Sequence, residues 1–269
     1  MTLHVQNHER TVQNHERTVQ NHERTVQNHE RTVQNFERSL ERSRASLTRT
    51  DRPRTFHLCD REWDLLDEVF APVYSPSTGI GLDFLGLAGG APAGSTRSFL
   101  DVGTGTGVIA VQAALAGAER VVALDINPRA VRNADLNARR HGVAGRVRSV
   151  HSDMFDGLSP DERFDTVFWS SNYVLAPEGY EYRSVHECAY VDVGYRAHRR
   201  FLAEAPLRLT PHGRALLHFS TRGDLGELRR IAGECGRELR TVAAVDVLEG
   251  VYGSDRVEHL LLEVVPVVR

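Results

Sequence analysis

Residues 98–110 read Ser-Phe-Leu-Asp-Val-Gly-Thr-Gly-Thr-Gly-Val-Ile-Ala. The apolar run 99–102 predicts a buried strand, and the run that begins at Val108 predicts a helix. The glycines between them let the backbone turn tightly and let a ligand approach the main chain. In an open α/β sheet such a loop lies at the carboxyl end of a strand, where ligands bind. The alternative is a glycine turn with a structural role only.

Strand and helix patterns alternate from this loop to the end of the chain. Strands separated by helices form βαβ units and a parallel sheet. The two closely spaced final strands favour an antiparallel hairpin at the sheet edge. We therefore expect an α/β fold with a Rossmann-like, mostly parallel sheet whose last strand is antiparallel. The expected strands are 99–102, 120–125, 147–151, 164–169, 214–219, 240–248 and 257–268, and the expected helices are 108–116, 128–141, 195–209 and 225–235.

A seven-residue repeat, Thr-Val-Gln-Asn-His-Glu-Arg, fills most of the first 38 residues. A spacing of three and four between seam positions is typical of a coiled coil. We expect residues 1–50 to form a heptad-repeat helix that self-associates through residues 4–47; a disordered, duplicated tail is the alternative. Histidines seven residues apart on one helix cannot chelate an ion together, and we predict no metal site. The seam positions are Val5, Val12, Val19, Val26, Val33, Leu40 and Leu47, with His8, His15, His22, His29 and Phe36.

The composition indicates a cytoplasmic protein. The formal net charge is -3, whereas nucleic-acid binders usually show a basic face. The cysteines, Cys59, Cys188 and Cys235, form no Cys-x-x-Cys pair and are expected to be reduced thiols. The sequence has neither a signal-peptide core nor an apolar run of the length that spans a membrane. We expect neither nucleic acid nor membrane as a partner.

Two acidic residues accompany the glycine loop. Asp101 precedes it, where a carboxylate would repel a pyrophosphate but suits a cofactor with a cationic amino-acid end. Asp125 ends the second expected strand, at a spacing that fits a carboxylate accepting both ribose hydroxyls. Nicotinamide-dependent dehydrogenases share the second feature, so an oxidoreductase is the alternative on these residues alone.

Residues 100–110, together with Val-Ala-Leu-Asp-Ile-Asn-Pro-Arg-Ala-Val-Arg-Asn at 122–133, resemble class I S-adenosylmethionine (SAM)-dependent methyltransferases. They are most similar to the group of HemK-like protein-glutamine and ribosomal-protein methyltransferases. The resemblance extends over roughly residues 69–217. It implies a methyltransferase domain at 98–269. Before it we expect an N-terminal helical adjunct at 51–97, in which the amphipathic pattern of residues 62–70 predicts a short helix and residues 81–87 predict another.

The same resemblance implies SAM as the cofactor. It assigns the methionine part of SAM to residues 103–105 and the ribose to Asp125. Asp153 would accept from the adenine amino group, and Met154 or Phe155 would flank the ring. The complete set of implied cofactor residues is Asp101, Gly103, Thr104, Gly105, Gly107, Asp125, Ile126, Asn127, Asp153, Met154 and Ser170.

The end of the fourth strand departs from the family pattern. HemK-like enzymes have Asn-Pro-Pro-Tyr where this chain has Ser-Ser-Asn-Tyr at 170–173, so that only Tyr173 matches. The family's asparagine holds a planar amide or amine nitrogen beside the methyl donor, and Asn172 offers an amide two positions later. We predict Tyr173, Asn172 and Glu178 as the catalytic residues.

The following segment, 178–190, is rich in tyrosine and carboxylate and has little helical or strand pattern. We interpret it as a substrate lid, because tyrosine faces accept cationic or aromatic groups; a merely structural insertion is the alternative. The predicted substrate-binding residues are Tyr180, Glu181, Tyr182 and His186.

These observations predict methyl transfer to a nitrogen of a small amino-acid-like metabolite. The degenerate Asn-Pro-Pro-Tyr position and the near-neutral charge argue against glutamine side chains and nucleic acids. One alternative is a protein methyltransferase that acts on a side-chain nitrogen. Another is a non-catalytic SAM-binding scaffold organised by the coiled coil.

Overall fold

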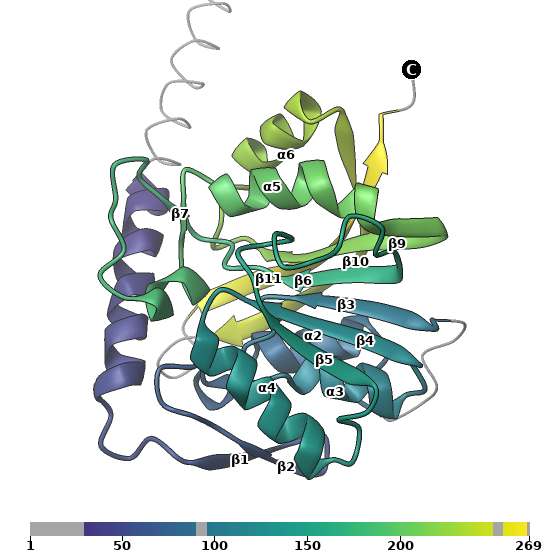
Figure 1. Ribbon diagram of the computed structural model, residues 1–269. Coiled ribbons are helices and arrows are strands. Elements are labelled where there is room, and N and C mark those ends of the chain that lie inside the picture. Colours follow the sequence, from purple (N-terminus) through teal and green to yellow (C-terminus); the bar gives the residue numbers. More distant parts are fainter. Residues whose placement is uncertain (1–29, 90–95, 250–254, 268–269) are drawn as a thin grey trace, which may run out of the picture.

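The computed structural model describes residues 30–89, 96–249 and 255–267. Its main sheet has seven strands in the order β10-β11-β9-β6-β3-β4-β5. Only β11 runs against its neighbours β9 and β10, so the predicted mostly parallel, Rossmann-like sheet with an antiparallel last strand is confirmed (Figure 1). The strands are β3 (Ser98–Val102), β4 (Arg120–Asp125), β5 (Val147–His151), β6 (Phe164–Ser170), β9 (Leu209–Ser220), β10 (Arg237–Glu249) and β11 (Asp255–Pro266).

Helices cover both faces of the sheet (Figure 1). On one face, α3 packs against the sheet and against the neighbouring helices α2 and α4. Seven of its side chains are therefore buried. On the other face, α5 and α6 bury Phe201, Leu202 and Ile231 in a second core. No helix within the described ranges is both long and apolar enough to cross a membrane. The helices are α2 (Ser77–Phe84), α3 (Val108–Leu115), α4 (Pro128–Arg140), α5 (Arg196–Glu204) and α6 (Leu225–Glu234).

The helix predicted at 62–70 is wrong: residues 62–64 lie in β2 (Arg61–Asp64), which forms a β-hairpin with β1 (Thr55–Leu58), and residues 65–70 are turn and irregular structure. The turn of the hairpin places Cys59 and Asp60 at positive φ. Trp63 is fully buried, and the α4 side chain of Asn137 accepts a hydrogen bond from Asp64 N at 2.8 Å. Docking on α4 therefore overrides the amphipathic pattern. The adjunct 51–97 is thus only partly helical, with the short 3-10 turn η1 (Pro72–Tyr74) and α2 after the hairpin.

The helix predicted over 195–209 is shorter than expected. It ends at Glu204 and is followed by the 3-10 turn η3 (Ala205–Arg208), which contains Pro206. Proline disfavours helical geometry in the residue before it, and β9 then begins at Leu209.

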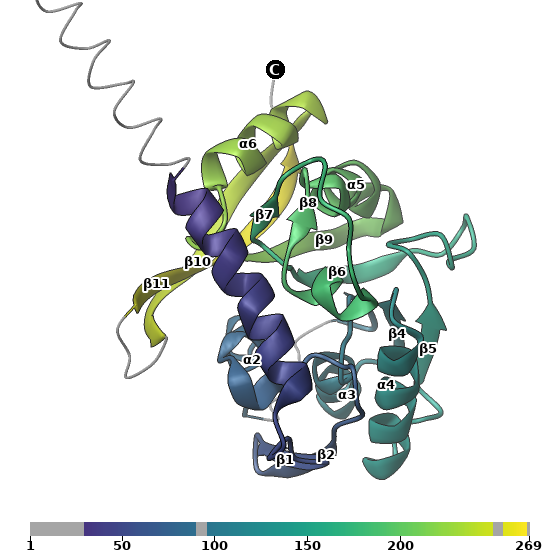
Figure 2. The ribbon, with the colours of Figure 1, turned by 90° about the vertical axis from the view of Figure 1, so that its left-hand side faces the viewer.

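An N-terminal helix covers residues 30–48 and lies across the front of the domain in Figure 2, beside β7 (Leu175–Ala176) and β8 (Asp192–Val193). Leu40 is buried in a cluster with Val174, Val191 and Val193, and Phe36 packs against the same cluster. These two seam positions therefore contact their own chain, and the predicted self-association through residues 4–47 is not shown. The rest of the repeat, residues 1–29, lies outside the described residues.

We predict that Leu40→Ala destabilises the protein by about 2–3 kcal/mol, because it leaves a cavity between the helix and the lid. Urea unfolding measures this loss. Val33→Ala is the control, since Val33 is 40% exposed on the same helix and should change stability by less than about 0.5 kcal/mol. Equal effects of the two substitutions would show that the helix does not dock as described.

Candidate functional site

A cavity of about 1370 Å³ opens at the carboxyl ends of β3, β4 and β6. The strand order reverses between β3 and β6, and open α/β sheets bind ligands at such a switch point. The lining includes the N-terminal helix, the segment 68–78, the glycine loop, the end of β4, residues 152–154, the segment 169–193, the start of α5 and the end of β10. Its volume exceeds that of a pocket for one small ligand.

Hydrogen bonds to two aspartates fix the glycine loop. Asp125 accepts from Gly105 N with one carboxylate oxygen and from Asn127 N with the other, both at 2.8 Å. The hydroxyl of Thr104 donates to Asp101 at 2.6 Å. The loop is therefore held in place by the protein alone and keeps one side toward the cavity.

The three predicted loop glycines have different environments. Gly105 has a φ of 55°, and a Cβ there would meet no atom within 4 Å, so its open side faces space that a ligand can fill. A Cβ on Gly103 would lie 3.1 Å from Trp169 Nε1. Gly107 does not line the cavity: a Cβ there would lie 2.6 Å from Ala134 Cα. Its assignment as a cofactor residue is corrected to a close contact between the start of α3 and α4.

Burial dominates the electrostatics of both aspartates. It raises the pKa of Asp101 to about 7, opposed by the Thr104 hydroxyl and reinforced by the charge of Asp125. Burial also raises the pKa of Asp125 to about 6, against the hydrogen bonds from Asn127 N and Gly105 N. A cationic ligand would favour the ionised forms of both carboxyl groups.

The other predicted cofactor residues line the same cavity. Ile126 directly follows Asp125 and is 40% exposed, which is unusual for a large apolar side chain at a strand end. Met154 is largely buried and has a φ of 47°. Asp153 is exposed and lies 3.5 Å from Arg200 in an ion pair. Ile126 and Met154 offer an apolar surface for a base, and the carboxylates of Asp125 and Asp153 lie beside it. This combination suits a nucleoside.

At the end of β6, Ser170, Asn172 and Tyr173 all line the cavity. The Asn172 amide nitrogen donates to Cys188 O at 2.8 Å and to Val191 O at 2.9 Å. Its Oδ1 is buried and has no hydrogen-bond partner in the described part of the chain. This side chain is therefore held at the cavity wall by its amide nitrogen, and its acceptor is closed to solvent.

The predicted lid is held by hydrogen bonds within itself and to the N-terminal helix. The Tyr180 hydroxyl donates to Glu187 at 2.8 Å, and His186 Nδ1 lies 2.8 Å from Ser43 Oγ. Burial, followed by the charge of Arg52, lowers the pKa of His186 to about 4, so this histidine is neutral. Tyr180, Glu181, Tyr182 and His186 line the cavity, and their role in substrate binding stays a prediction.

Glu178 is the one predicted catalytic residue that lies elsewhere. It is exposed, outside the cavity lining, and its side chain approaches Gly194. The physical reason is the pairing of β7 with β8, which turns the start of the lid outward. We correct its predicted catalytic role to a position at the protein surface.

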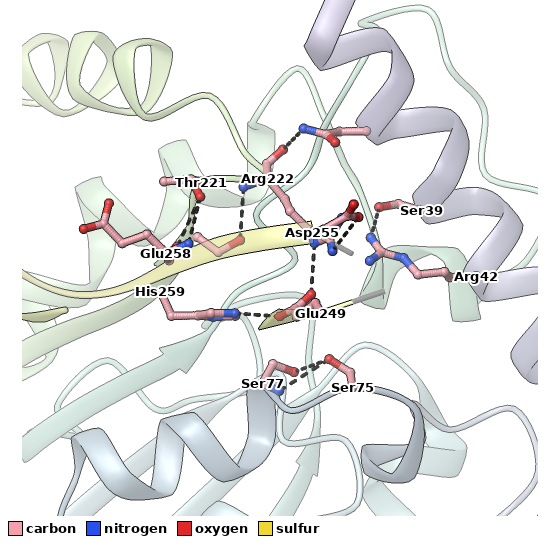
Figure 3. A network of polar contacts seen from close by, with 12 residues as sticks. Ser39, Arg42, Ser75, Ser77, Thr221, Arg222, Glu249, Asp255, Glu258 and His259 are labelled. Atoms are coloured by element: carbon pink, nitrogen blue, oxygen red, sulfur yellow. Dashed lines mark hydrogen bonds and ion pairs between the residues drawn. The ribbon is translucent and has the colours of Figure 1, made fainter. Parts of the chain in front are cut away.

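Sequence reasoning missed residues at both ends of the chain. Arg42 of the N-terminal helix and Glu249 of β10 line the cavity. Glu249 binds Arg222 and His259, as Figure 3 shows. His259 stands directly before Leu-Leu-Leu in an apolar strand, and a histidine in such a strand indicates a buried polar contact. The sequence does not indicate that its partner is Glu249 on a different strand.

Comparisons with known proteins agree with this site. A family described as "Methyltransferase domain" matches residues 99–191. A release factor glutamine methyltransferase of Cereibacter sphaeroides is 34% identical over 64% of this chain and 62% of its own length. A ribosomal protein L11 methyltransferase of Pelotomaculum thermopropionicum is 57% identical over 21% of this chain and 18% of its own. The fold is also similar to a 16S rRNA N2 G1207 methyltransferase of T. thermophilus, at 19% identity and a TM-score of 0.52, over 78% of this chain and 49% of that one.

The chain therefore carries a class I methyltransferase domain with SAM as its cofactor. Within this class it is similar to release factor glutamine and ribosomal protein L11 methyltransferases. It spans less than two thirds of the relatives named above. Those two relatives are named for protein substrates, and this overturns our prediction of a small-molecule partner.

The pKa values predict a pH dependence of SAM binding. SAM carries a sulfonium and an ammonium group, so its binding favours ionised Asp101 and Asp125. We expect the affinity for SAM to fall as the pH drops through about 7 and about 6, the pKa values of the two groups. The loss should approach roughly tenfold per pH unit for each group once it is protonated. Calorimetric titrations between about pH 8 and about pH 5 measure it.

The stability of the free protein should change in the opposite direction. Both folded-state pKa values lie above the ordinary value of 3.8. The contribution of these carboxyl groups to stability is therefore full below about pH 4 and is lost as the pH rises through about 6 and 7.

For the binding prediction, a SAM affinity that stays constant between about pH 8 and about pH 5 would contradict the placement of the two aspartates at the cofactor.

Proposed function

We propose that the protein transfers a methyl group from SAM to a side-chain nitrogen of a protein substrate. In this proposal Asp125 accepts the ribose hydroxyls, and the open side of Gly105 faces the cofactor. The ammonium end lies near Asp101. The adenine lies against Ile126 and Met154, with Asp153 at its amino group; Gly103, Thr104, Asn127 and Ser170 complete the surrounding wall.

The observation that carries the choice of nitrogen is the state of Asn172. Both donors of its amide are used by Cys188 O and Val191 O. A buried acceptor without a partner costs about 1–3 kcal/mol, and Asn172 Oδ1 is such an acceptor. A substrate that donates a hydrogen bond would satisfy it once the wall moves to uncover the atom, which is closed to solvent in the free protein. Amide, amine and hydroxyl groups are donors, whereas a carbon or thioether acceptor of the methyl group is not. Among these donors, the relative named a release factor glutamine methyltransferase favours nitrogen.

Two further features support a protein as the substrate. The cavity has room for more than the cofactor. Apolar side chains that are open to solvent lie in its lining: Val73 is 43% and Leu248 is 69% exposed. An extended polypeptide can bury such a rim while one side chain enters the cavity. The relatives named for a release factor and for ribosomal protein L11 fit this reading.

The test uses methyl-labelled SAM with purified bacterial release factor and ribosomal protein L11 as acceptors, and free glutamine and lysine as small-molecule controls. We expect label on a side-chain nitrogen of a protein, located by mass spectrometry of its peptides. Asn172→Ala should lower the rate at least about tenfold, because a hydrogen bond to the reacting group is lost. The affinity for SAM should stay within about twofold.

Label on the free amino acids at a rate equal to that on the proteins would contradict a protein substrate. Full activity of Asn172→Ala would contradict the role of its acceptor. SAM binding without transfer to any of these acceptors would favour the non-catalytic alternative.

A further inference from the structure

A chain of hydrogen bonds leads from the inner wall of the cavity through three strands. Ser170 Oγ lies 3.1 Å from His218 Nδ1, because the two residues face each other in the β6–β9 register. His218 Nε2 lies 2.9 Å from His259 Nδ1 on β11. His259 Nε2 lies 2.7 Å from Glu249 Oε1, whose other oxygen accepts from Arg222 at 3.0 Å (Figure 3). We call Ser170, His218, His259 and Glu249 the relay chain.

With both imidazoles neutral, the carboxylate at the far end sets the direction of each bond. Burial raises the pKa of Glu249, but the His259 hydrogen bond and the Arg222 charge outweigh it and hold this pKa below its ordinary value. A carboxylate only accepts, so His259 Nε2 carries the proton. A neutral imidazole has one N–H, so His259 Nδ1 accepts from His218 Nε2. By the same argument the Ser170 hydroxyl donates to His218 Nδ1. Ser170 therefore presents only lone pairs to the cavity.

The surroundings of the relay chain exclude water. His218 and His259 are both 0% exposed. The ring of Phe84 meets His218 edge-on at 5.4 Å, and that of Tyr173 meets His259 edge-on at 6.2 Å. Burial lowers the pKa of His218 to about 3, with a further contribution from His259, and keeps it neutral. A buried imidazolium needs a paired anion, and only His259 has one in direct contact, Glu249.

We propose that the relay chain takes up the proton that the acceptor nitrogen loses on methylation. The proposal rests on the proposed transfer to nitrogen. As the nitrogen lone pair bonds to the methyl carbon, the carbon–sulfur bond breaks and its electron pair stays on sulfur. The N–H proton passes to Ser170 Oγ, and the serine hydroxyl proton moves to His218 Nδ1. The His218 Nε2 proton then moves to His259 Nδ1.

The step ends with an imidazolium at His259, stabilised by the Glu249 carboxylate as a buried acid stabilises a catalytic histidine. Glu249 itself lines the cavity, which gives the proton a route back to solvent. In this proposal Ser170 contacts the acceptor nitrogen. His218, His259 and Glu249 are positioning residues that act through Ser170.

The test compares Glu249→Gln with Glu263→Gln. Both glutamates lie on the β10–β11 hairpin, are paired with arginine and have side chains only 6% and 9% exposed. With release factor or ribosomal protein L11, whichever takes the label, Glu249→Gln should lower kcat about 100-fold. Its KM for the acceptor and Kd for SAM should stay within about twofold. Glu263→Gln should leave all three unchanged within about twofold.

A second measurement needs no turnover. Nitrogen NMR of the full chain with labelled histidine should show His218 and His259 neutral, each with its proton on Nε2. A proton on Nδ1 of either ring, or a charged His259 at rest, would overturn the relay and leave the proposed methyl transfer intact.

Unchanged kcat in a folded Glu249→Gln variant would also overturn the relay. If that variant fails to fold, Ser170→Ala replaces it, since it removes only the entry hydroxyl; the same loss of kcat is expected, and full kcat would overturn the proposal. A wild-type protein that methylates no protein acceptor would instead overturn the proposed function, and the relay with it.

Discussion

The cofactor end of the sheet depends on the hydrogen bonds that Asp125 accepts from two loops. Gly105 N and Asn127 N each donate to one of its oxygens. A carboxylate taken out of water is costly unless it is hydrogen-bonded, so these bonds stabilise Asp125 and the loops together. They also draw the ends of β3 and β4 to one point, where the open side of Gly105 faces the cavity.

The opposite wall is built from parts of the chain that are distant in sequence. Asn172 is tied to the lid backbone, and the lid is tied to the N-terminal helix through Ser43 and His186. Behind this wall, the β9–β11 pairing sets two histidines in line with Ser170. Asn172 and Ser170 in this wall are therefore both held by hydrogen bonds to residues behind it.

The sequence predicted the parallel sheet and the glycine loop because both rest on local patterns: an apolar strand, a glycine turn and a proline-started helix. It failed at 62–70, where docking of Trp63 on α4 overrides the pattern. Phe36 and Leu40 continue the seven-residue repeat, which fits a seam between chains, yet both pack within their own chain, and no local pattern distinguishes the two uses. The link from His218 to His259 joins two strands 41 residues apart, and no spacing rule predicts it.

The central claim is that Asp125 holds the ribose of SAM. Calorimetry with Asp125→Asn tests it most directly, because the substitution keeps the shape and removes the charge. Asp161→Asn is the matched control, on an exposed aspartate outside the cavity. The account predicts that Asp125→Asn weakens SAM binding by about 2 kcal/mol, or roughly 30-fold, and that the control stays within about twofold. Equal SAM affinity in both variants would contradict it.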